Sequence, residues 1–191
     1  MGLPATEKRF TYGDYLRWPE EERWELIEGV AHDMSPAPSR THQRISLELA
    51  VRLRDYFRGR SCELYYAPFD VRLPIGDETD EDIETVVQPD IVVVCDRSKL
   101  DERGCRGAPD LVVEILSPHT ASKDLKKKLS LYEKHRVRQY WIVQPEHKVV
   151  LVFSLGADGR YGRPDVYAAA DKMESTLFDG LTIDLAAVFA E

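Results

Sequence analysis

Long hydrophobic runs are missing from this sequence of 191 residues. No segment approaches the roughly 18 to 20 apolar residues that a helix needs to cross a bilayer. The first thirty residues also lack the apolar core of a secretion signal. The sequence alone therefore predicts a protein with no membrane contact that stays inside the cell.

An excess of positive charge is also missing, because the formal net charge is -8. A protein with this charge does not coat nucleic acid or anionic membrane by bulk electrostatics. Any contact with nucleic acid has to be local.

Cysteine is scarce, with Cys62, Cys95 and Cys105 and no CxxC pair. Neither a disulfide framework nor a zinc site is predicted from this pattern. A reducing, cytoplasmic setting fits it best.

The pattern of apolar residues predicts one α/β domain over residues 1–191, with 43% hydrophobic residues available for its core. Its expected architecture is a mixed sheet flanked by helices, preceded by a short helical lead-in over residues 1–24. The expected elements are a hairpin at 24–36, helices at 42–57 and 120–136, a three-stranded meander formed by 64–73, 86–94 and 109–116, further strands at 139–144 and 147–153, and a short terminal helix.

Two of the meander strands carry an acid where a buried strand is expected, in QPDIVVV (88–94) and APDLVVEILSP (108–118). Proline is best tolerated at a strand's beginning, so Asp90 is expected at the strand's entrance, facing a cleft. Glu114 interrupts an otherwise apolar strand face. If the strands are neighbours, the two carboxylates converge and repel unless a cation or a shared proton lies between them.

Oxygen ligands of this kind suit Mg²⁺, which binds a few carboxylates and keeps waters that a phosphate can displace. The alternative is that Glu114 pairs with an arginine or a lysine and only closes the sheet. In the helix predicted at 120–136, Lys128 lies beside the apolar stripe, with Asp124 one turn earlier on the same flank. An inward Lys128 could assist at a metal-bound phosphate, whereas a solvated lysine run is the better interpretation of Lys126 and Lys127.

A Pro-Asp pair, a strand glutamate 24 residues after Asp90 and a later lysine resemble the PD-(D/E)xK nuclease superfamily. More narrowly, the sequence resembles the Uma-type restriction endonucleases from about residue 10 to 190. The motifs that carry this resemblance are, in order, WELIEG, MSPAPSRTHQRIS, QPDIVVV, APDLVVEILSP, DLKKKLSLY, VRQYWIVQPE and LFDGLTIDL.

This resemblance implies a restriction-endonuclease-like fold whose active site lies at the fork of the meander. It implies that Asp90 and Glu114 ligate Mg²⁺ or Mn²⁺ and that a lysine completes the triad. The superfamily lysine expected two residues after the glutamate is Leu116 here. The resemblance to the Uma-type family implies that this lysine lies on the following helix instead, and Lys128 matches that position.

Two further residues are weaker candidates. Glu28 could add a carboxylate at the metal site, or it could be a simple turn residue. His42 opens a helix whose N-terminus favours anions and could touch a phosphate, or it could be an ordinary polar residue at a helix start.

These residues predict a metal-dependent endonuclease that hydrolyses DNA phosphodiester bonds, acting as a homodimer because a cut through both strands needs two active sites. One alternative is a weakly active or inactive binding module that keeps the nuclease fold, since Leu116 occupies the lysine slot. Another is a metal-dependent hydrolase of a smaller phosphate ester, which would use the same acids.

Overall fold

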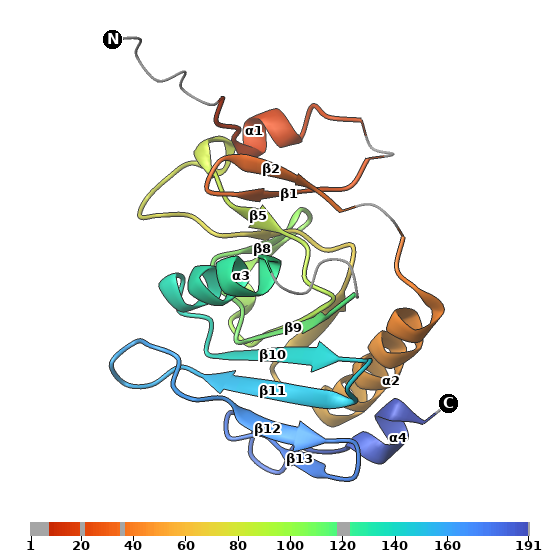
Figure 1. The fold of residues 1–191 in the computed structure, drawn as a ribbon. Helices are drawn as coiled ribbons and strands as arrows, with labels where there is room; N and C mark the ends of the chain where they lie inside the picture. The colour runs from red at the N-terminus through yellow and green to blue at the C-terminus, as the bar shows by residue number, and fades with distance from the viewer. Residues whose placement is uncertain (1–7, 20–21, 35–36, 118–122, 191) are drawn as a thin grey trace.

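The computed structural model describes residues 8–19, 22–34, 37–117 and 123–190, with backbone only for 123–125. Its main sheet contains six strands in the order β12-β11-β10-β9-β6-β3 (Figure 1). Their bounds are β3 Glu63–Tyr66, β6 Ile91–Val94, β9 Leu111–Ile115, β10 Gln139–Gln144, β11 Val149–Ser154 and β12 Asp165–Ala168.

The predicted meander is present as β3, β6 and β9, which pair antiparallel in this order. Strands β9 and β10 are parallel, and helix α3 (Lys123–Lys134) makes the crossover that a parallel pair requires. Strands β10, β11 and β12 continue the sheet in antiparallel fashion. The mixed sheet predicted from the sequence is therefore confirmed.

Two helices cover opposite faces of the main sheet. Helix α2 (Arg40–Phe57) packs its predicted stripe against alternate strand residues such as Val93 and Val113. Leu131 and Tyr132 of α3 pack against the intervening residues on the other face. This arrangement follows from the period of two along each strand, which sends successive side chains to opposite faces. The buried stripe of α2 is Ile45, Leu49, Leu53 and Phe57.

A second six-stranded sheet, which the sequence did not predict, has the order β2-β1-β5-β4-β8-β7. The strands predicted at 64–73 and 86–94 each break in two and contribute to both sheets. Pro68 and Pro89 lie at the breaks and offer no N–H to a ladder. The bounds are β1 Trp24–Ile27, β2 Val30–Asp33, β4 Val71–Arg72, β5 Val86–Val87, β7 Leu100–Asp101 and β8 Gly104–Arg106.

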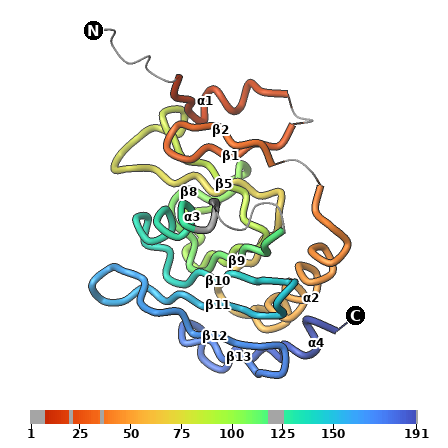
Figure 2. The backbone as a smooth tube through the Cα atoms, in the orientation of Figure 1, coloured from red at the N-terminus to blue at the C-terminus, as the bar shows by residue number. Residues whose placement is uncertain are grey.

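The backbone trace shows the N-terminal hairpin at one end of the molecule and the C-terminal strands at the other (Figure 2). The hairpin of β1 and β2 and the short C-terminal helix α4 (Leu185–Phe189) match their predictions. Helix α1 (Tyr12–Tyr15) falls within the predicted lead-in. The remaining elements are β13 Lys172–Glu174, β14 Thr182–Asp184 and the 3-10 turns η1 Asp80–Asp82 and η2 Arg97–Lys99.

The prediction that the cysteines form no disulfide is wrong, because Cys62 and Cys95 are bonded to each other. Cys62 precedes β3 and Cys95 follows β6, and these strands pair up to Glu63 and Val94. The antiparallel register therefore brings two residues 33 positions apart into contact. Because two of the three cysteines are bonded to each other, the cysteines do not indicate a reducing compartment.

Within the described ranges, no helix is both long enough and apolar enough to span a bilayer.

Candidate active site

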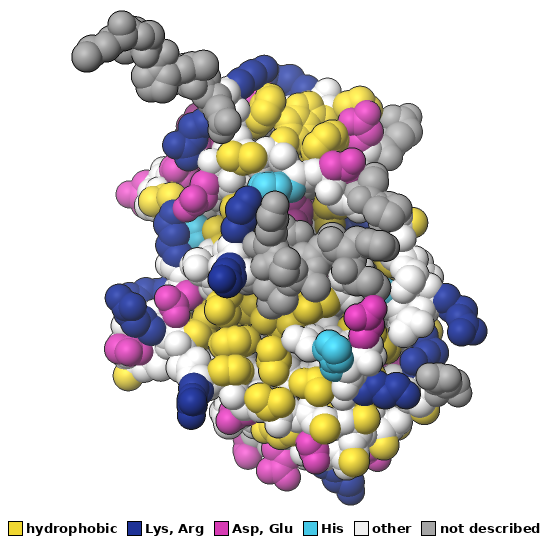
Figure 3. Space-filling model, viewed as in Figure 1, with side chains coloured by type: hydrophobic (Ala, Val, Ile, Leu, Met, Phe, Trp, Pro, Cys, Tyr) yellow, Lys and Arg dark blue, Asp and Glu magenta, His cyan; other side chains and the backbone are white. Residues whose placement is uncertain are grey.

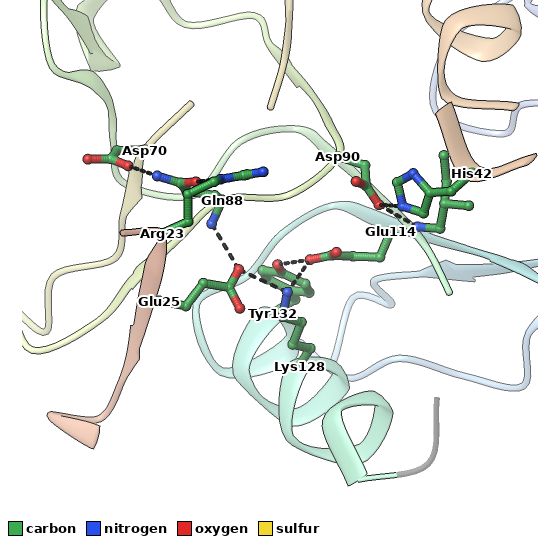
Figure 4. Close-up of polar contacts among 10 residues, drawn as sticks. Arg23, Glu25, His42, Asp70, Gln88, Asp90, Glu114, Lys128 and Tyr132 are labelled. Atoms are coloured by element: carbon green, nitrogen blue, oxygen red, sulfur yellow. Dashed lines mark hydrogen bonds and ion pairs between the residues drawn. The ribbon is translucent and has the colours of Figure 1, made fainter. Parts of the chain in front are cut away.

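A cleft of about 1590 Å³ opens where the two sheets and the first turns of α2 meet. Its walls include Glu25 from β1, His42 from α2, Asp90 from the link between β5 and β6, Glu114 from β9, and Lys128 from α3. Figure 4 shows these polar side chains in one row, with Asp90 and His42 at one end. The cleft therefore collects acids, a lysine and a histidine from five separate segments.

Asp90 lies directly before β6, as its neighbouring proline led us to expect. Its Oδ2 atom accepts hydrogen bonds from the backbone N–H of Ile115, at 2.7 Å, and from Nε2 of His42, at 3.2 Å. The first bond ties the carboxylate to the end of β9, the strand that carries Glu114. Asp90 is thus held between α2 and β9 through one of its two oxygens.

His42 lies in the first turn of α2, where the Ser39 side chain accepts a hydrogen bond from its backbone N–H. Burial lowers the pKa of His42, but the hydrogen bond and charge of Asp90 outweigh it, so the pKa is raised overall. The structure gives His42 a contact with Asp90, where the sequence suggested one with phosphate. Its Nδ1 atom is buried without a hydrogen-bond partner among the described residues.

Glu114 and Lys128 form a buried ion pair, with Nζ of Lys128 2.8 Å from Oε1 of Glu114. The same Oε1 atom accepts a hydrogen bond of 2.7 Å from the hydroxyl of Tyr132, one turn further along α3. Each side chain of the ion pair is only 12% exposed. Helix packing therefore brings a lysine to Glu114 although Leu116 fills the usual lysine position.

The sequence interpretation missed Glu25, which is buried in β1. Its Oε1 atom accepts hydrogen bonds of 2.9 Å from Nζ of Lys128 and from the backbone N–H of Gln88. The signal was available, because Glu25 stands in a short apolar strand just as Glu114 does. Tyr132 was also missed as a polar partner, since its position on the apolar stripe indicated only packing.

The cluster carries more negative than positive charge. Burial raises the pKa of Glu114 to about 7, and the charges of Glu25 and Asp90 raise it too, against the lowering effect of Lys128. Burial lowers the pKa of Lys128, but Glu114 and Glu25 outweigh this and raise it well above its ordinary value. The site therefore has a protonated lysine and an excess of negative charge that a further cation could balance.

The donor chemistry of the cluster fits a hard divalent cation. Asp90 and Glu114 offer carboxylate oxygens beside an open cleft, and each is held by protein contacts through one oxygen. Within the described part of the chain, no three acidic, histidine or cysteine side chains converge on one point. One or two carboxylates with water and a substrate phosphate is the usual way in which Mg²⁺ is bound.

The weaker candidate Glu28 lies away from this cluster. Glu28 is exposed in the β1–β2 turn, 2.6 Å from Nζ of Lys134, and does not line the cleft. Its alternative reading as a turn residue matches its position and its positive φ of 50°. Asp124 lies in α3, but its side chain falls outside the described residues. Lys126 and Lys127 are exposed, as predicted.

The fold is restriction-endonuclease-like. A solved structure from Anabaena variabilis, titled as a putative nuclease belonging to DUF820, matches with a TM-score of 0.74 and 21% identity. The match covers 94% of this chain and 97% of that one. At this identity the likeness shows the shared fold.

The model of the Uma2 family, described as "Putative restriction endonuclease", matches residues 12–186. The chain belongs to this family. An uncharacterized protein of Synechocystis sp. (strain ATCC 27184 / PCC 6803 / Kazusa) is 27% identical over 164 residues, which is 84% of this chain and 82% of that protein. The family resemblance seen in the sequence is therefore confirmed.

Proposed function

We propose that this chain is a metal-dependent endonuclease that hydrolyses DNA phosphodiester bonds. The observation that carries the proposal is the buried Lys128 held between Glu114 and Glu25, with Asp90 beside it on an open cleft. A buried cluster of three acids and one lysine is an expensive arrangement for stability alone, since unpaired buried charge costs several kcal/mol, about 3–5. Buried titratable groups with shifted pKa values are found most often at functional sites.

Asp90 and Glu114 would hold Mg²⁺ or Mn²⁺ through carboxylate oxygens. When bound, the metal supplies Lewis-acid activation of the scissile phosphate and of a water molecule. The remaining side chains prepare the site for that ion. His42 and the backbone of Ile115 orient Asp90, and Tyr132 orients Glu114.

Lys128 has the geometry of a charge-stabilising group. Its ammonium donates to two carboxylates and stays protonated between them, so it is poorly suited to act as a base. A fixed positive charge beside the phosphate can instead offset the negative charge that develops during hydrolysis. Glu25 serves to position Lys128, and Gln88 in turn holds Glu25 through its backbone N–H.

Cleavage of both DNA strands requires two such sites, and we propose a homodimer for this reason. The β11–β12 edge offers one apolar surface for it, because exposed Val166 pairs with half-buried Leu151 on the face that α3 leaves open. A chain acting as a monomer would nick plasmid DNA instead.

The test is cleavage of supercoiled plasmid with Mg²⁺ or Mn²⁺ by the wild type, by Glu114→Gln and by Glu28→Gln. Glu114→Gln is expected to lower the rate about 100-fold or more, because it removes a proposed ligand and the partner of Lys128. Glu28→Gln removes an exposed carboxylate outside the cleft and should retain wild-type activity. Equal activity of wild type and Glu114→Gln, or no cleavage of plasmid or of single-stranded DNA by the wild type with either metal, would reject the nuclease.

A further inference from the structure

An exposed aromatic residue stands beside the proposed metal site. Tyr66 ends β3, the edge strand of the main sheet, and lines the cleft with 67% of its surface exposed. It pairs with Ile91, and the backbone N–H of the next residue, Ala67, donates to the carbonyl oxygen of Asp90 at 3.1 Å. Tyr66 is therefore one ladder position away from Asp90.

The adjoining wall of the cleft is a stripe along α2, separate from the stripe that packs in the core. Its members recur at helical spacing, so they share one face of the helix. Leu47, near the middle of the stripe, is 64% exposed. An exposed leucine and an exposed tyrosine that line one cleft suit a ligand with apolar faces. The stripe that lines the cleft is Arg40, Gln43, Leu47, Val51 and Arg54.

The charge of the cleft outside the carboxylate cluster is positive. Its charged members among the described lining residues are Arg23, Arg40, Arg44 and Arg54 against the single acid Asp33. Figure 3 shows Lys and Arg side chains spread over the visible face, including the side of the molecule where α2 lies. In a protein of net charge -8, the four arginines of the cleft concentrate the attraction for an anionic chain there.

Arginines interleaved with exposed apolar and aromatic side chains are the features that bind unpaired nucleotides, whose bases stack on rings while arginines contact phosphates. In a duplex the base faces are covered by neighbouring base pairs, so Tyr66 and Leu47 would find no surface to contact. The carboxylates are recessed, with the Asp90 side chain only 18% exposed, so the backbone of the substrate must enter the cleft to reach them.

We infer that the cleft takes a single unpaired nucleic-acid strand, with Tyr66 stacking on a base next to the phosphate that Asp90 and Glu114 face. This inference rests on the proposed nuclease function and specifies its substrate. The preferred DNA would be single-stranded, or locally open at a flap, gap or frayed end. Arg40 and Arg54 would contact phosphates along the strand.

The test is fluorescence anisotropy of a labelled DNA strand of about 12 nucleotides, a length within the range that one such groove covers. The same strand is measured alone and annealed to its complement, with the wild-type chain in a metal chelator. The single strand is expected to bind about 10-fold more tightly than the duplex. Equal or tighter binding of the duplex would overturn the inference.

Substitutions of Tyr66 test whether its ring stacks on a base of the bound strand. Tyr66→Ala should weaken single-strand binding about 5- to 150-fold, the range expected for one stacked base, whereas Tyr66→Phe keeps the ring and should match wild type. Ile75→Ala, which trims an exposed apolar residue outside the cleft, is the matched control. If Tyr66→Ala behaves like Ile75→Ala while both remain folded by thermal melting, Tyr66 stacks on no base and the inference fails.

Salt dependence separates phosphate contact from stacking. Arg40→Gln should reduce the slope of log affinity against log salt by about 0.7, the contribution of one contact with a single-strand phosphate. Arg58→Gln on the same helix lies outside the cleft and should leave the slope unchanged. If both variants show the same slope of log affinity against log salt, the proposed contact between Arg40 and a phosphate is contradicted.

This binding assay uses neither metal nor cleavage, so it can fail independently of the proposed function. If the chain cleaves plasmid but binds duplex DNA more tightly than the single strand, the proposed nuclease function is supported and the single-strand assignment is rejected. Single-strand binding without cleavage under any metal would support the cleft assignment and remove the nuclease. If the wild-type chain binds neither single-stranded nor duplex DNA, the single-strand assignment is rejected, and the exposed Tyr66 and Leu47 would instead contact a protein partner.

Discussion

Replacing Lys128 with methionine is expected to lower the free energy of unfolding by about 3–5 kcal/mol at pH 9 and by only about 1 kcal/mol at pH 5. At pH 9 the substitution leaves the buried carboxylates of Glu114 and Glu25 facing each other without the ammonium that joins them. At pH 5 Glu114 takes up a proton, so the repulsion between the two carboxylates disappears.

The sign follows from the pKa of Glu114. Burial already raises this pKa to about 7 with Lys128 in place, and Lys128 opposes the rise. In the variant the pKa rises further, so the folded state binds an extra proton and gains stability at low pH, which it loses as pH rises through the folded-state pKa. Lys128 itself is protonated at both pH values, folded or unfolded, and adds no slope.

Urea unfolding of metal-free protein at the two pH values measures this effect. Lys127→Met is the matched control, because Lys127 is the exposed neighbour on the same helix. It should change stability by at most about 0.5 kcal/mol at either pH. A Lys128→Met loss that is the same at pH 5 and pH 9 would show that the cluster is not held by charge.

Replacing Arg72 with methionine is expected to lower the free energy of unfolding by about 3 kcal/mol. The Arg72 side chain is fully buried in β4, where Nη2 lies 2.6 Å from Oδ1 of Asp101 and Nη1 is bonded to Asp80. Each hydrogen bond to a charged group contributes about 1.5–3 kcal/mol. The loss is smaller than their sum because Asp80 and Asp101 are partly exposed and regain water.

Arg106→Met supplies the comparison, since Arg106 shares Asp80 as its partner but is half-exposed. An exposed pair of this kind contributes about 0–1 kcal/mol. Chemical denaturation should therefore separate the two arginine variants by about 2 kcal/mol. Unlike the effect of Lys128→Met, the Arg72→Met effect should be equal at pH 6 and pH 9. Burial raises the pKa of Asp101, but the hydrogen bond from Arg72 outweighs it and holds this pKa below its ordinary value. Equal losses for Arg72→Met and Arg106→Met would contradict the bracing role of the buried guanidinium.

Local sequence patterns predicted the elements that depend on neighbouring residues. The spacing of Ile45, Leu49 and Leu53 is that of a helix packed on one side, and α2 has that stripe buried. The same kind of argument placed Lys128 toward the interior and its two lysine neighbours in solvent. These features follow from the helical repeat and need no knowledge of the partner.

The features that the sequence did not predict depend on contacts between distant segments. Glu25 reaches Lys128 across 103 residues, and no local pattern says which of several strand acids will meet which lysine. The second sheet arises because segments broken at Pro68 and Pro89 pair in two directions. The disulfide of Cys62 and Cys95 likewise follows from the register of β3 and β6, which only the folded sheet reveals.

Asp90, Glu114 and Lys128 line one cleft. Proximity alone fits an ion-pair network that closes the space between two sheets. A divalent cation is what distinguishes a nuclease site from such a network.

Calorimetric titration of Mn²⁺ into the metal-free chain tests that distinction most directly. If Asp90 and Glu114 hold a divalent metal, we expect saturable binding of one Mn²⁺ ion per chain at up to millimolar concentration. Asp90→Asn should weaken this binding by about 100-fold, at least as much as the loss of a residue that only supports a ligand. Glu28→Gln should bind as the wild type does. No saturable binding by the wild type, or equal affinity in Asp90→Asn, would contradict the assignment of a metal to these acids.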